Sequence, residues 1–382
     1  MTNREHWTRP PRVAVLWGGL SGYFHAQLSA LRAAGAEVLV VHRSLDASAP
    51  FDLDELTLAI DARAWSEAPD ETELEAALDD FDPDVLLVMS WDVGAYRRAA
   101  RRRRGRTLRL LCMDNQWWGT AKQWGGVLIS RFVLQPAYDA VFVAGGRQAE
   151  FARRLGFRAE RTMWGLYVGD TPTFEKVAVD RGDQLPPEAF LYVGRLAPEK
   201  AIDVLAAAYQ AYRRRVADPW PLIVSGTGPE VHRVAGLEGV ELLGFVQPSQ
   251  LPEVMARAGC LVLPSRFEPW GVVVHEAAAA GLPIICTWVC GASTRLVLDG
   301  YNGVVISPDD AAGLADGLAR ISTAGAVRRL AMGRASRQLA QQLTPDRWAS
   351  YLLERVPDLR SAVGLEPTPW AAAGARQGAA QP

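Results

Sequence analysis

The chain has 382 residues, about half of them hydrophobic, and its 41 Lys and Arg are balanced by 43 Asp and Glu. This composition excludes a collagen-like, disordered or disulfide-scaffold chain, and the length predicts two globular domains. The balanced charge gives no basic surface for nucleic acid, so we expect no such partner. The cysteines, at positions 112, 260, 286 and 290, show neither zinc spacing nor a disulfide framework, which favours the cytoplasm.

Short apolar runs alternate with helical stretches in the first half of the chain. Strands are predicted over residues 13–17, 38–41, 85–89, 108–112 and 141–144, with helices over 23–34 and 147–155. Strands that alternate with helices predict a parallel sheet covered on both faces.

The alternation lapses between Thr171 and Pro187, where Pro and Gly predict an exposed connector. It resumes with strands predicted over 190–193, 221–225, 240–243, 260–263, 283–287 and 303–306, and helices over 201–215, 249–258, 272–280 and 311–321. The prediction is therefore an α/β chain of two Rossmann-like, doubly wound domains facing a central cleft. We assign residues 1–175 to the first domain, 176–345 to the second, 346–366 to a C-terminal helix beginning near Pro345, and 367–382 to a disordered tail.

Residues 263–283 are the most informative segment. A buried strand ends at Pro264, a loop carries Glu268, and a helix begins near Gly271. The first amides of a helix lack intrahelical partners, and a glycine there lets an anion approach the backbone. Glu276 lies one and a half turns further along, where its carboxylate could accept hydrogen bonds from sugar hydroxyls.

A second segment, residues 190–201, combines a strand, a glycine turn at Gly194 and two cations. Arg195 emerges where the strand ends, and Lys200 stands at the entry of the next helix. A planar guanidinium and a compact ammonium together suit a diphosphate. Lysine occurs only at 122, 176 and 200 in a chain that otherwise uses arginine. This rarity favours a functional role for the ammonium group of Lys200.

These two segments resemble the donor site of the retaining, GT-B-fold glycosyltransferases of family 4. The resemblance lies in a Gly-Arg…Lys pair and in two Glu separated by seven residues and followed by Gly-x-Pro, which here are Gly194, Arg195, Lys200, Glu268, Glu276, Gly281 and Pro283. It is specific over residues 170–307 and only architectural over the first 165.

The resemblance implies transfer of a sugar from a nucleotide-diphosphate sugar without a metal or another cofactor. Arg195 and Lys200 would neutralise the leaving diphosphate with the backbone at Gly271, Val272 and Val273. Glu276 would hold the ribose, and Glu268 would contact donor-sugar hydroxyls. The donor site implied in this way comprises Gly194, Arg195, Lys200, Gly226, Phe245, Glu268, Gly271, Val272, Val273 and Glu276, with catalysis assigned to Arg195, Lys200, Glu268 and Asp114.

The first domain would bind the acceptor, which the sequence leaves open as a glycan, a lipid or a small molecule. The family often has a His after a mid-domain strand, but the corresponding loop here carries Asp114, Asn115 and Gln116. Asp114 is the candidate base, and Asn115 and Gln116 could position hydroxyls. The acceptor candidates are Gly19, His25, Trp117 and Trp118, and His275 is expected to pack rather than react.

Two alternatives to transfer are a nucleotide-sugar epimerase of the same fold and a catalytically silent partner that binds nucleotide.

A basic cluster, Arg97 to Arg106, has two interpretations of its own. It is either a solvated helix end or a contact with anionic lipid, which would place the protein peripherally at the inner face of the membrane.

Overall fold

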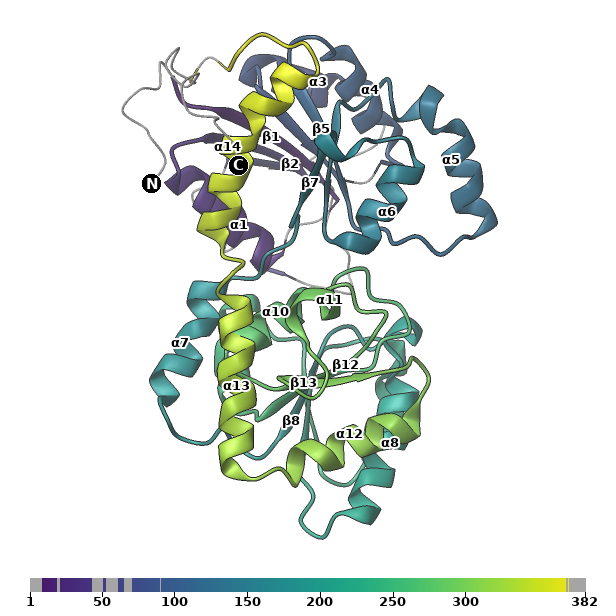
Figure 1. The fold of residues 1–382 in the computed structure, drawn as a ribbon, viewed down its shortest axis with the longest axis vertical. Helices are drawn as coiled ribbons and strands as arrows, with labels where there is room; N and C mark the ends of the chain where they lie inside the picture. The colour runs from purple at the N-terminus through teal and green to yellow at the C-terminus, as the bar shows by residue number, and fades with distance from the viewer. Residues whose placement is uncertain are drawn as a thin grey trace, which may run out of the picture.

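The computed structural model describes residues 9–18, 21–42, 51–52, 61–64, 71–89, 91–368 and 370. Two α/β domains lie along the long axis of the molecule, the N-terminal one above the C-terminal one in Figure 1. Each contains one parallel sheet, and the predicted fold class is confirmed.

The N-terminal domain is built on seven parallel strands in the order β3-β2-β1-β4-β5-β6-β7. The five strands predicted from the sequence are confirmed to within two residues. The two edge strands, β3 and β7, were not predicted, because β3 is an Asp-Ala-Arg-Ala run and β7 has only three residues. The strands are β1 (Arg12–Trp17), β2 (Glu37–His42), β3 (Asp61–Ala64), β4 (Val85–Val88), β5 (Leu108–Met113), β6 (Ala140–Val143) and β7 (Thr162–Trp164).

Helices follow the strands of this domain as a doubly wound fold requires. Buried side chains from the sheet and from one face of most helices form its core, whereas α5 buries only Ser130. The helices are α1 (Gly22–Ala33), α3 (Thr72–Phe81), α4 (Gly94–Arg102), α5 (Ala121–Val133) and α6 (Gly146–Arg154).

The C-terminal domain has six parallel strands in the order β10-β9-β8-β11-β12-β13, and all six were predicted. The order reverses beside β8, at the sheet's topological switch point. Ligands of open α/β sheets bind at such a point, outside the carboxyl ends of the strands. The strands are β8 (Phe190–Val193), β9 (Leu222–Ser225), β10 (Val240–Gly244), β11 (Cys260–Leu263), β12 (Ile284–Thr287) and β13 (Gly303–Ile306).

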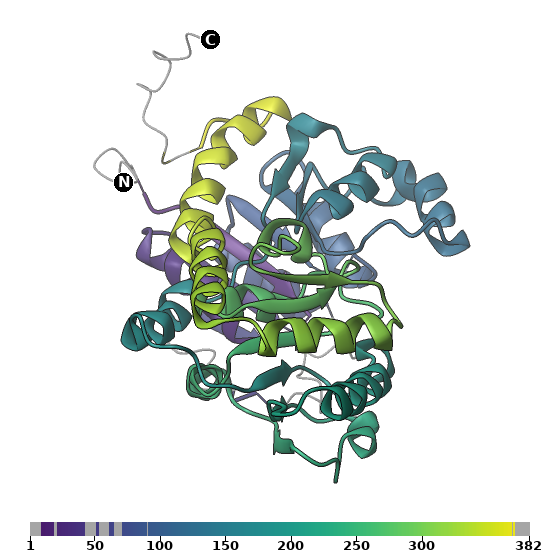
Figure 2. The same ribbon diagram turned by 60° about the horizontal axis from the view of Figure 1, so that its bottom comes forward.

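Helices cover both faces of this second sheet, with α8 and α12 packed together and α10 in contact with α7 and α13 (Figure 2). The sequence did not predict α13, whose apolar pattern is weak. The helices are α7 (Thr171–Arg181), α8 (Ile202–Arg215), α9 (Leu251–Ala256), α10 (Val272–Ala279), α11 (Ser293–Leu296), α12 (Ala311–Ser322), α13 (Ala326–Ala340) and α14 (Pro345–Ala362).

The connector predicted from Thr171 is wrong over its first part, because Thr171–Arg181 forms α7. The Asp170 side chain caps this helix by accepting a hydrogen bond from the Thr173 amide, and Pro172 occupies the first turn, where proline is tolerated. Phe174 is buried beneath it. Local capping and one apolar anchor therefore form a helix where the proline suggested irregular chain.

The last helix, α14, returns to the N-terminal domain and packs against α1 (Figure 1). Trp348 is buried and stacks on Phe142 of β6 at a ring-centroid distance of 6.0 Å. The Arg360 guanidinium donates to the backbone carbonyls of Asp84 and Arg106 at 3.0 and 3.3 Å. After the segment that leads into β8, α14 is thus the second stretch of chain that connects the two domains.

This helix begins at Pro345, as predicted, and ends at Ala362, before the predicted end at residue 366. It continues through Pro357 to Ala362, since burial of Leu359 and the bonds of Arg360 hold the turn after the proline. Thr368 and Trp370, assigned to the disordered tail, are buried, and residues 371–382 lie outside the described residues. Within the described part of the chain, every helix is too short or too polar to cross a bilayer.

Replacing Trp348 with alanine should remove the stack on Phe142 and leave a cavity between α14 and the first sheet. Large-to-small changes at such buried aromatic sites cost roughly 3–5 kcal/mol. Urea unfolding followed by circular dichroism should therefore show a clearly lower midpoint for Trp348→Ala. Glu354→Ala, at an exposed position of the same helix, is the control, and equal midpoints for the two variants would contradict the packing described.

Candidate active site

A cavity of about 670 Å³ lies between the two domains, at the carboxyl ends of β8 and β9. We call it the interdomain cavity. The loops after β10 and β11, the first turn of α10 and the start of α1 complete its walls. It brings together every residue predicted to bind the donor: Gly194, Arg195, Lys200, Gly226, Phe245, Glu268, Gly271, Val272, Val273 and Glu276.

The loops after β8 and β11 are joined along their length. The carbonyl oxygen of Glu199 accepts hydrogen bonds from the amides of Arg266 and Phe267 at 2.9 and 3.1 Å. The Arg266 guanidinium holds the arrangement from outside, through Asp203 at 2.7 Å and Asp309 at 2.5 Å. This joint carries Lys200 and Glu268, which are far apart in sequence, to the same wall of the cavity.

Lys200 and Glu268 form a largely buried ion pair, with Nζ 2.5 Å from Oε2. Arg195 lies at the more exposed rim, where its guanidinium is 2.6 Å from Glu199. The sequence predicted both cations and Glu268 as site residues, but it predicted neither ion pair. Two positive groups therefore line one cavity, and each is held in place by a carboxylate.

The N-terminus of α10 lines the cavity beside this ion pair. Gly271 precedes the helix with a φ of 86°, and a β-carbon there would lie 2.8 Å from Cys290 Sγ and 3.1 Å from Glu268 Cγ. Only glycine fits without displacing Glu268. The amides of Val272 and Val273 belong to the first turn, where no preceding helical carbonyl can accept them, so this wall suits an anion.

Glu276 lies one turn further along α10 and also lines the cavity. Burial, together with the negative charge of Asp170, raises the pKa of its carboxyl to about 8. Gly169 packs directly over the Glu276 side chain, where a β-carbon would lie 3.1 Å from its Cγ. The carboxyl is thus held at a protein surface that a hydroxylated ligand can reach.

The neighbouring His275 is structural, as the sequence suggested. Its Nδ1 accepts a hydrogen bond from the Gly169 amide at 3.0 Å, and its Nε2 lies 3.2 Å from the Ala340 carbonyl oxygen. Burial lowers its pKa to about 4, so the ring is neutral near pH 7. It joins α10 to the turn before α7 and to the end of α13.

Gly194 and Gly226 bring the ends of β8 and β9 into close contact. Gly226 has a φ of 144°, and a β-carbon there would lie 1.9 Å from the Gly194 carbonyl oxygen. Phe245, after β10, forms the next part of the wall and contacts Phe51 of the N-terminal domain edge to face at 5.4 Å. The cavity therefore has one flat aromatic side.

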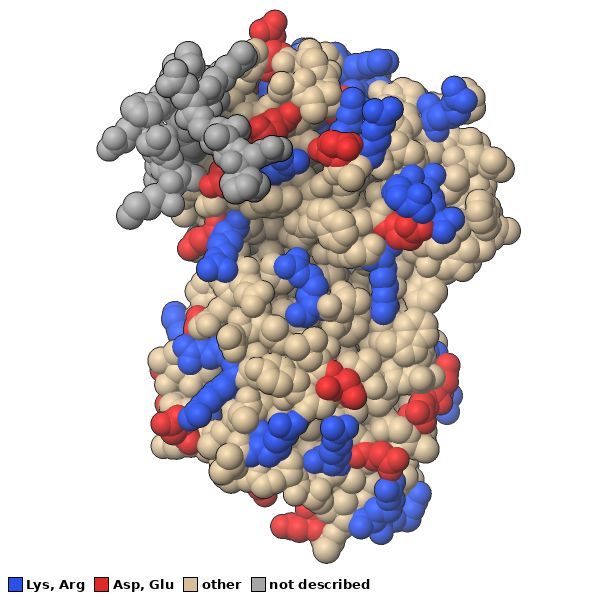
Figure 3. Space-filling model, in the orientation of Figure 1, with Lys and Arg blue, Asp and Glu red and all other residues tan. Residues whose placement is uncertain are grey.

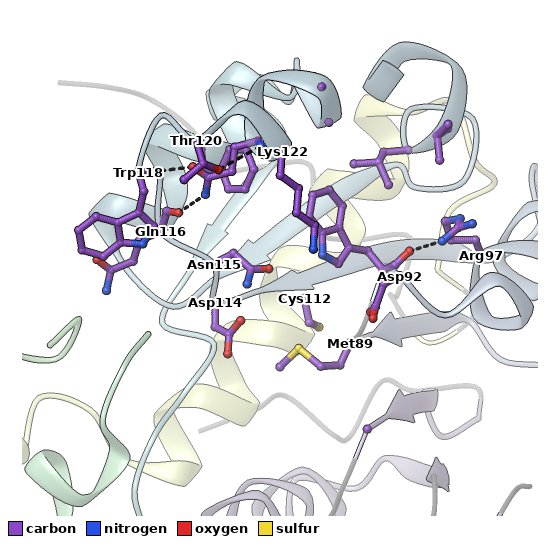
Figure 4. Close-up of a pocket in the computed structure, with 18 of the residues that line it drawn as sticks. Met89, Asp92, Arg97, Cys112, Asp114, Asn115, Gln116, Trp118, Thr120 and Lys122 are labelled. Atoms are coloured by element: carbon purple, nitrogen blue, oxygen red, sulfur yellow. Dashed lines mark hydrogen bonds between the residues drawn. The ribbon is translucent and has the colours of Figure 1, made fainter. Parts of the chain in front are cut away.

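A second cavity, of about 1060 Å³, lies in the N-terminal domain, and we call it the N-terminal cavity. Asp114 and Asn115 point into it from the loop after β5, between Trp118 on one side and Met89 on the other (Figure 4). Tyr167 donates a hydrogen bond to Asp114 at 3.1 Å. Burial raises the pKa of Asp114, and the negative charge of Glu268 acts in the same direction. Phe267, next to Glu268 in the chain, lines the same cavity as Asp114.

The predicted acceptor residues separate in the structure. Trp118 lines the N-terminal cavity, whereas Trp117 packs on Phe151 at 5.3 Å and under the Arg154 guanidinium at 4.6 Å. Trp117 is thus outside the lining of both cavities. His25 lines the interdomain cavity instead of the N-terminal one, and Gly19 lies outside the described residues.

Two buried glutamines join the domains at the loop that carries Glu268. Gln116 Nε2 lies 3.0–3.1 Å from the carbonyl oxygens of Glu268, Pro269 and Val289. Gln148 Nε2 donates to Pro269 at 2.7 Å and to the Asp114 carbonyl at 3.0 Å. Gln116 also lines the N-terminal cavity, and its amide nitrogen holds one domain against the other.

Two family models match consecutive parts of the chain in the order of its domains. The model described as "Glycosyl transferase 4-like domain" matches residues 18–163, and that described as "Glycosyl transferases group 1" matches residues 187–324. The chain belongs to the GT-B glycosyltransferases of family 4. Membership makes it a glycosyl-transferring enzyme, so the interpretations as an epimerase or a silent partner are not supported.

Relatives of this glycosyltransferase cover different shares of it. It is 27% identical to the glycogen synthase of Mycobacterium tuberculosis over 89% of each chain. It is 30% identical to the D-inositol 3-phosphate glycosyltransferase of Salinispora tropica over 60% of this chain and 48% of that one.

Solved structures of similar fold include sucrose-phosphate synthase from Thermosynechococcus elongatus. Its TM-score is 0.72 at 20% identity, over 92% of this chain and all of that one. Anabaena HepE in complex with UDP gives a TM-score of 0.68 at 18% identity, over 90% and 98% of the two chains. At these identities the likeness establishes the two-domain fold.

Replacing Glu276 with glutamine should change how the glycosyltransferase's stability depends on pH. The folded protein keeps a proton on Glu276 up to about pH 8, whereas the unfolded chain releases it near 4.5. The free energy of unfolding should therefore fall as pH rises between these values, by at most about 1.4 kcal/mol per pH unit. Thermal unfolding at pH 5 and at pH 8.5 should show Glu276→Gln gaining stability relative to the wild type.

Glu354→Gln, at an exposed position of α14, is the control for this measurement and should follow the wild type at both pH values. An equal difference between Glu276→Gln and the wild type at pH 5 and pH 8.5 would show that Glu276 is not held protonated.

Proposed function

We propose that this glycosyltransferase moves a sugar from a nucleotide-diphosphate sugar to an acceptor hydroxyl, with retention of anomeric configuration and without a metal ion. The observation that carries the proposal is the convergence of Lys200, Arg195 and the first amides of α10 on one cavity. Cations and free amides that face one point stabilise the negative charge that develops on a departing diphosphate. The UDP in the complex of Anabaena HepE, a protein of the same fold, is consistent with such a donor.

The donor would lie along the wall of the interdomain cavity. The base would rest near Phe245, and the ribose hydroxyls would reach Glu276. The diphosphate would extend over Gly271 towards Lys200, where a ligand phosphate competes with Glu268 for the ammonium. Glu268 would then accept hydrogen bonds from the hydroxyls of the donor sugar, and this partner exchange links donor binding to placement of the sugar.

In the transfer step the bond between the anomeric carbon and the diphosphate oxygen breaks, and its electron pair leaves with the diphosphate. The acceptor oxygen forms the new bond on the same face of the sugar. Asp114 accepts the hydroxyl proton, because its buried carboxyl has a raised pKa and faces the N-terminal cavity. Retention then needs no covalent intermediate on Glu268.

Anomeric configuration and metal dependence test the proposal directly. Transfer to a soluble hydroxylated acceptor, followed by proton NMR of the new anomeric signal, should give a product with the donor's configuration. The rate should be the same in EDTA and in millimolar Mg²⁺. An inverted product, or a rate that EDTA abolishes and Mg²⁺ restores, would contradict the corresponding half of the proposal.

Lys200→Ala and Arg195→Ala should each lower kcat/KM for the donor by on the order of 10²-fold or more, since each removes a positive charge that acts most strongly in the transition state. Lys176→Ala, which changes one of the other two lysines at an exposed position of α7, is the matched control. Circular dichroism would establish that the variants are folded. Folded Lys200→Ala and Arg195→Ala proteins with unchanged kcat/KM would refute the assigned roles.

Asp114→Asn should lower kcat by roughly 10²- to 10⁴-fold, because the amide cannot accept the proton. The KM for the donor should change little, since Asp114 lies on the acceptor side. Tyr167→Phe removes the hydroxyl that donates to Asp114 and contacts Met89 Sδ, but leaves the Asp114 carboxyl in place, and should have a much smaller effect. A normal kcat in Asp114→Asn would show that the proton leaves by another path.

A further inference from the structure

The helix α5 carries a stripe of exposed apolar side chains. Trp124, Leu128 and Phe132 follow one another at four-residue spacing, so they lie on the same side of the helix. Their exposed fractions are 51%, 74% and 69%. Large apolar side chains that form a contiguous exposed patch, rather than standing singly, mark an interaction surface.

The other side of the same helix lines the N-terminal cavity, through Lys122, Gly125, Gly126, Ile129 and Val133. Ser130 is the helix's buried residue, and its partly buried Val127 and Val133 pack against the core of the N-terminal domain. An ordinary surface helix turns a polar face to water, whereas α5 is apolar on its solvent side. The helix therefore forms one wall of the N-terminal cavity and presents the apolar stripe to solvent.

Basic side chains border the stripe, and the sequence has no Asp or Glu from 115 to 138. The Arg131 guanidinium lies over the Phe132 ring at 5.2 Å. Arg101, at the end of α4, donates to the carbonyl oxygens of Phe132 and Val133 at 3.1 and 2.9 Å, which brings the arginine-rich end of α4 next to α5. Figure 3 shows Lys and Arg beside a largely uncharged surface in this upper right part of the molecule.

We propose that the α5 stripe, together with Arg131 and the exposed Arg101 and Arg104, docks on an anionic bilayer. A tryptophan, a leucine and a phenylalanine on one side of a helix can enter the headgroup region, while arginines beside them bind lipid phosphates. The absence of acidic residues from this segment removes the repulsion that an anionic surface would otherwise meet. The docked helix would place the N-terminal cavity directly behind the lipid interface.

Binding of the full-length protein to sedimenting vesicles tests the docking, with phosphatidylcholine vesicles compared with equimolar phosphatidylcholine and phosphatidylglycerol. The protein should bind the anionic vesicles at low salt, and binding should weaken as salt rises. The double variant Leu128→Ser/Phe132→Ser and the double variant Arg104→Glu/Arg131→Glu should each lower the partition coefficient at least tenfold.

Matched changes in the other domain provide the controls. Val327→Ser, at an 83% exposed position of α13, and Arg214→Glu, on the exposed side of α8, should bind vesicles as the wild type does. Lys200→Ala should also bind normally, which separates the docking from the proposed transfer chemistry.

Three results would overturn the docking proposal. The first is no binding to anionic vesicles at low salt, and the second is equal binding by the α5 variants and their controls. The third is a dimer, seen by analytical ultracentrifugation, that the Leu128→Ser/Phe132→Ser change dissociates, because the stripe would then be an interface between two copies of the chain.

Discussion

Two backbone hydrogen bonds to the carbonyl oxygen of Glu199 determine where the charged groups of the site meet. They join the loop after β8 to the loop after β11 and thereby carry Lys200 to Glu268. A buried ammonium without a partner would be costly, so the Glu268 carboxylate stabilises Lys200 where it stands. A ligand that brings its own negative charge can take over that role. The same pair can therefore maintain the fold and respond to a diphosphate.

The second constraint is the set of hydrogen bonds that hold the loop after β11 against the N-terminal domain. Gln116 and Gln148 bind the carbonyls of residues 268 and 269, and Gln148 also binds the Asp114 carbonyl. The loop bearing Glu268 and the loop bearing Asp114 are thus fixed to each other across the domain boundary. Transfer needs the donor and acceptor groups within bonding distance. The relative position of these two loops therefore matters as much as the charges do.

The sequence predicted the parts of the molecule that follow local rules. Buried strands of parallel sheets are continuous apolar runs, and all six strands of the second domain were recognised from them. Glycine and charge at strand ends pointed to Lys200, Glu268 and Gly271. The short edge strands β3 and β7 lack such a run. The helix α7 was missed because Pro172 suggested irregular chain, although Asp170 caps the helix locally.

Partners across long sequence distances could not be predicted. Nothing local to Gln116 shows that its amide meets carbonyls more than 150 residues away, and Trp117 and Trp118 look alike in sequence although one packs inward and the other lines a cavity. Likewise, no pattern in the sequence of α5 shows that one side of the helix lines a cavity. Its stripe of apolar residues is therefore exposed to solvent, which the sequence alone does not predict. Such features depend on tertiary contacts, which one sequence does not specify.

The central claim is that the interdomain cavity recognises a diphosphate through Lys200, Arg195 and the amides of α10. Calorimetric titration in EDTA with a nucleoside diphosphate and with the matching monophosphate tests it most directly. The diphosphate should bind at least tenfold more tightly, and Lys200→Ala should abolish most of that difference. Equal affinities for the two nucleotides, or a preference unchanged in Lys200→Ala, would contradict the claim.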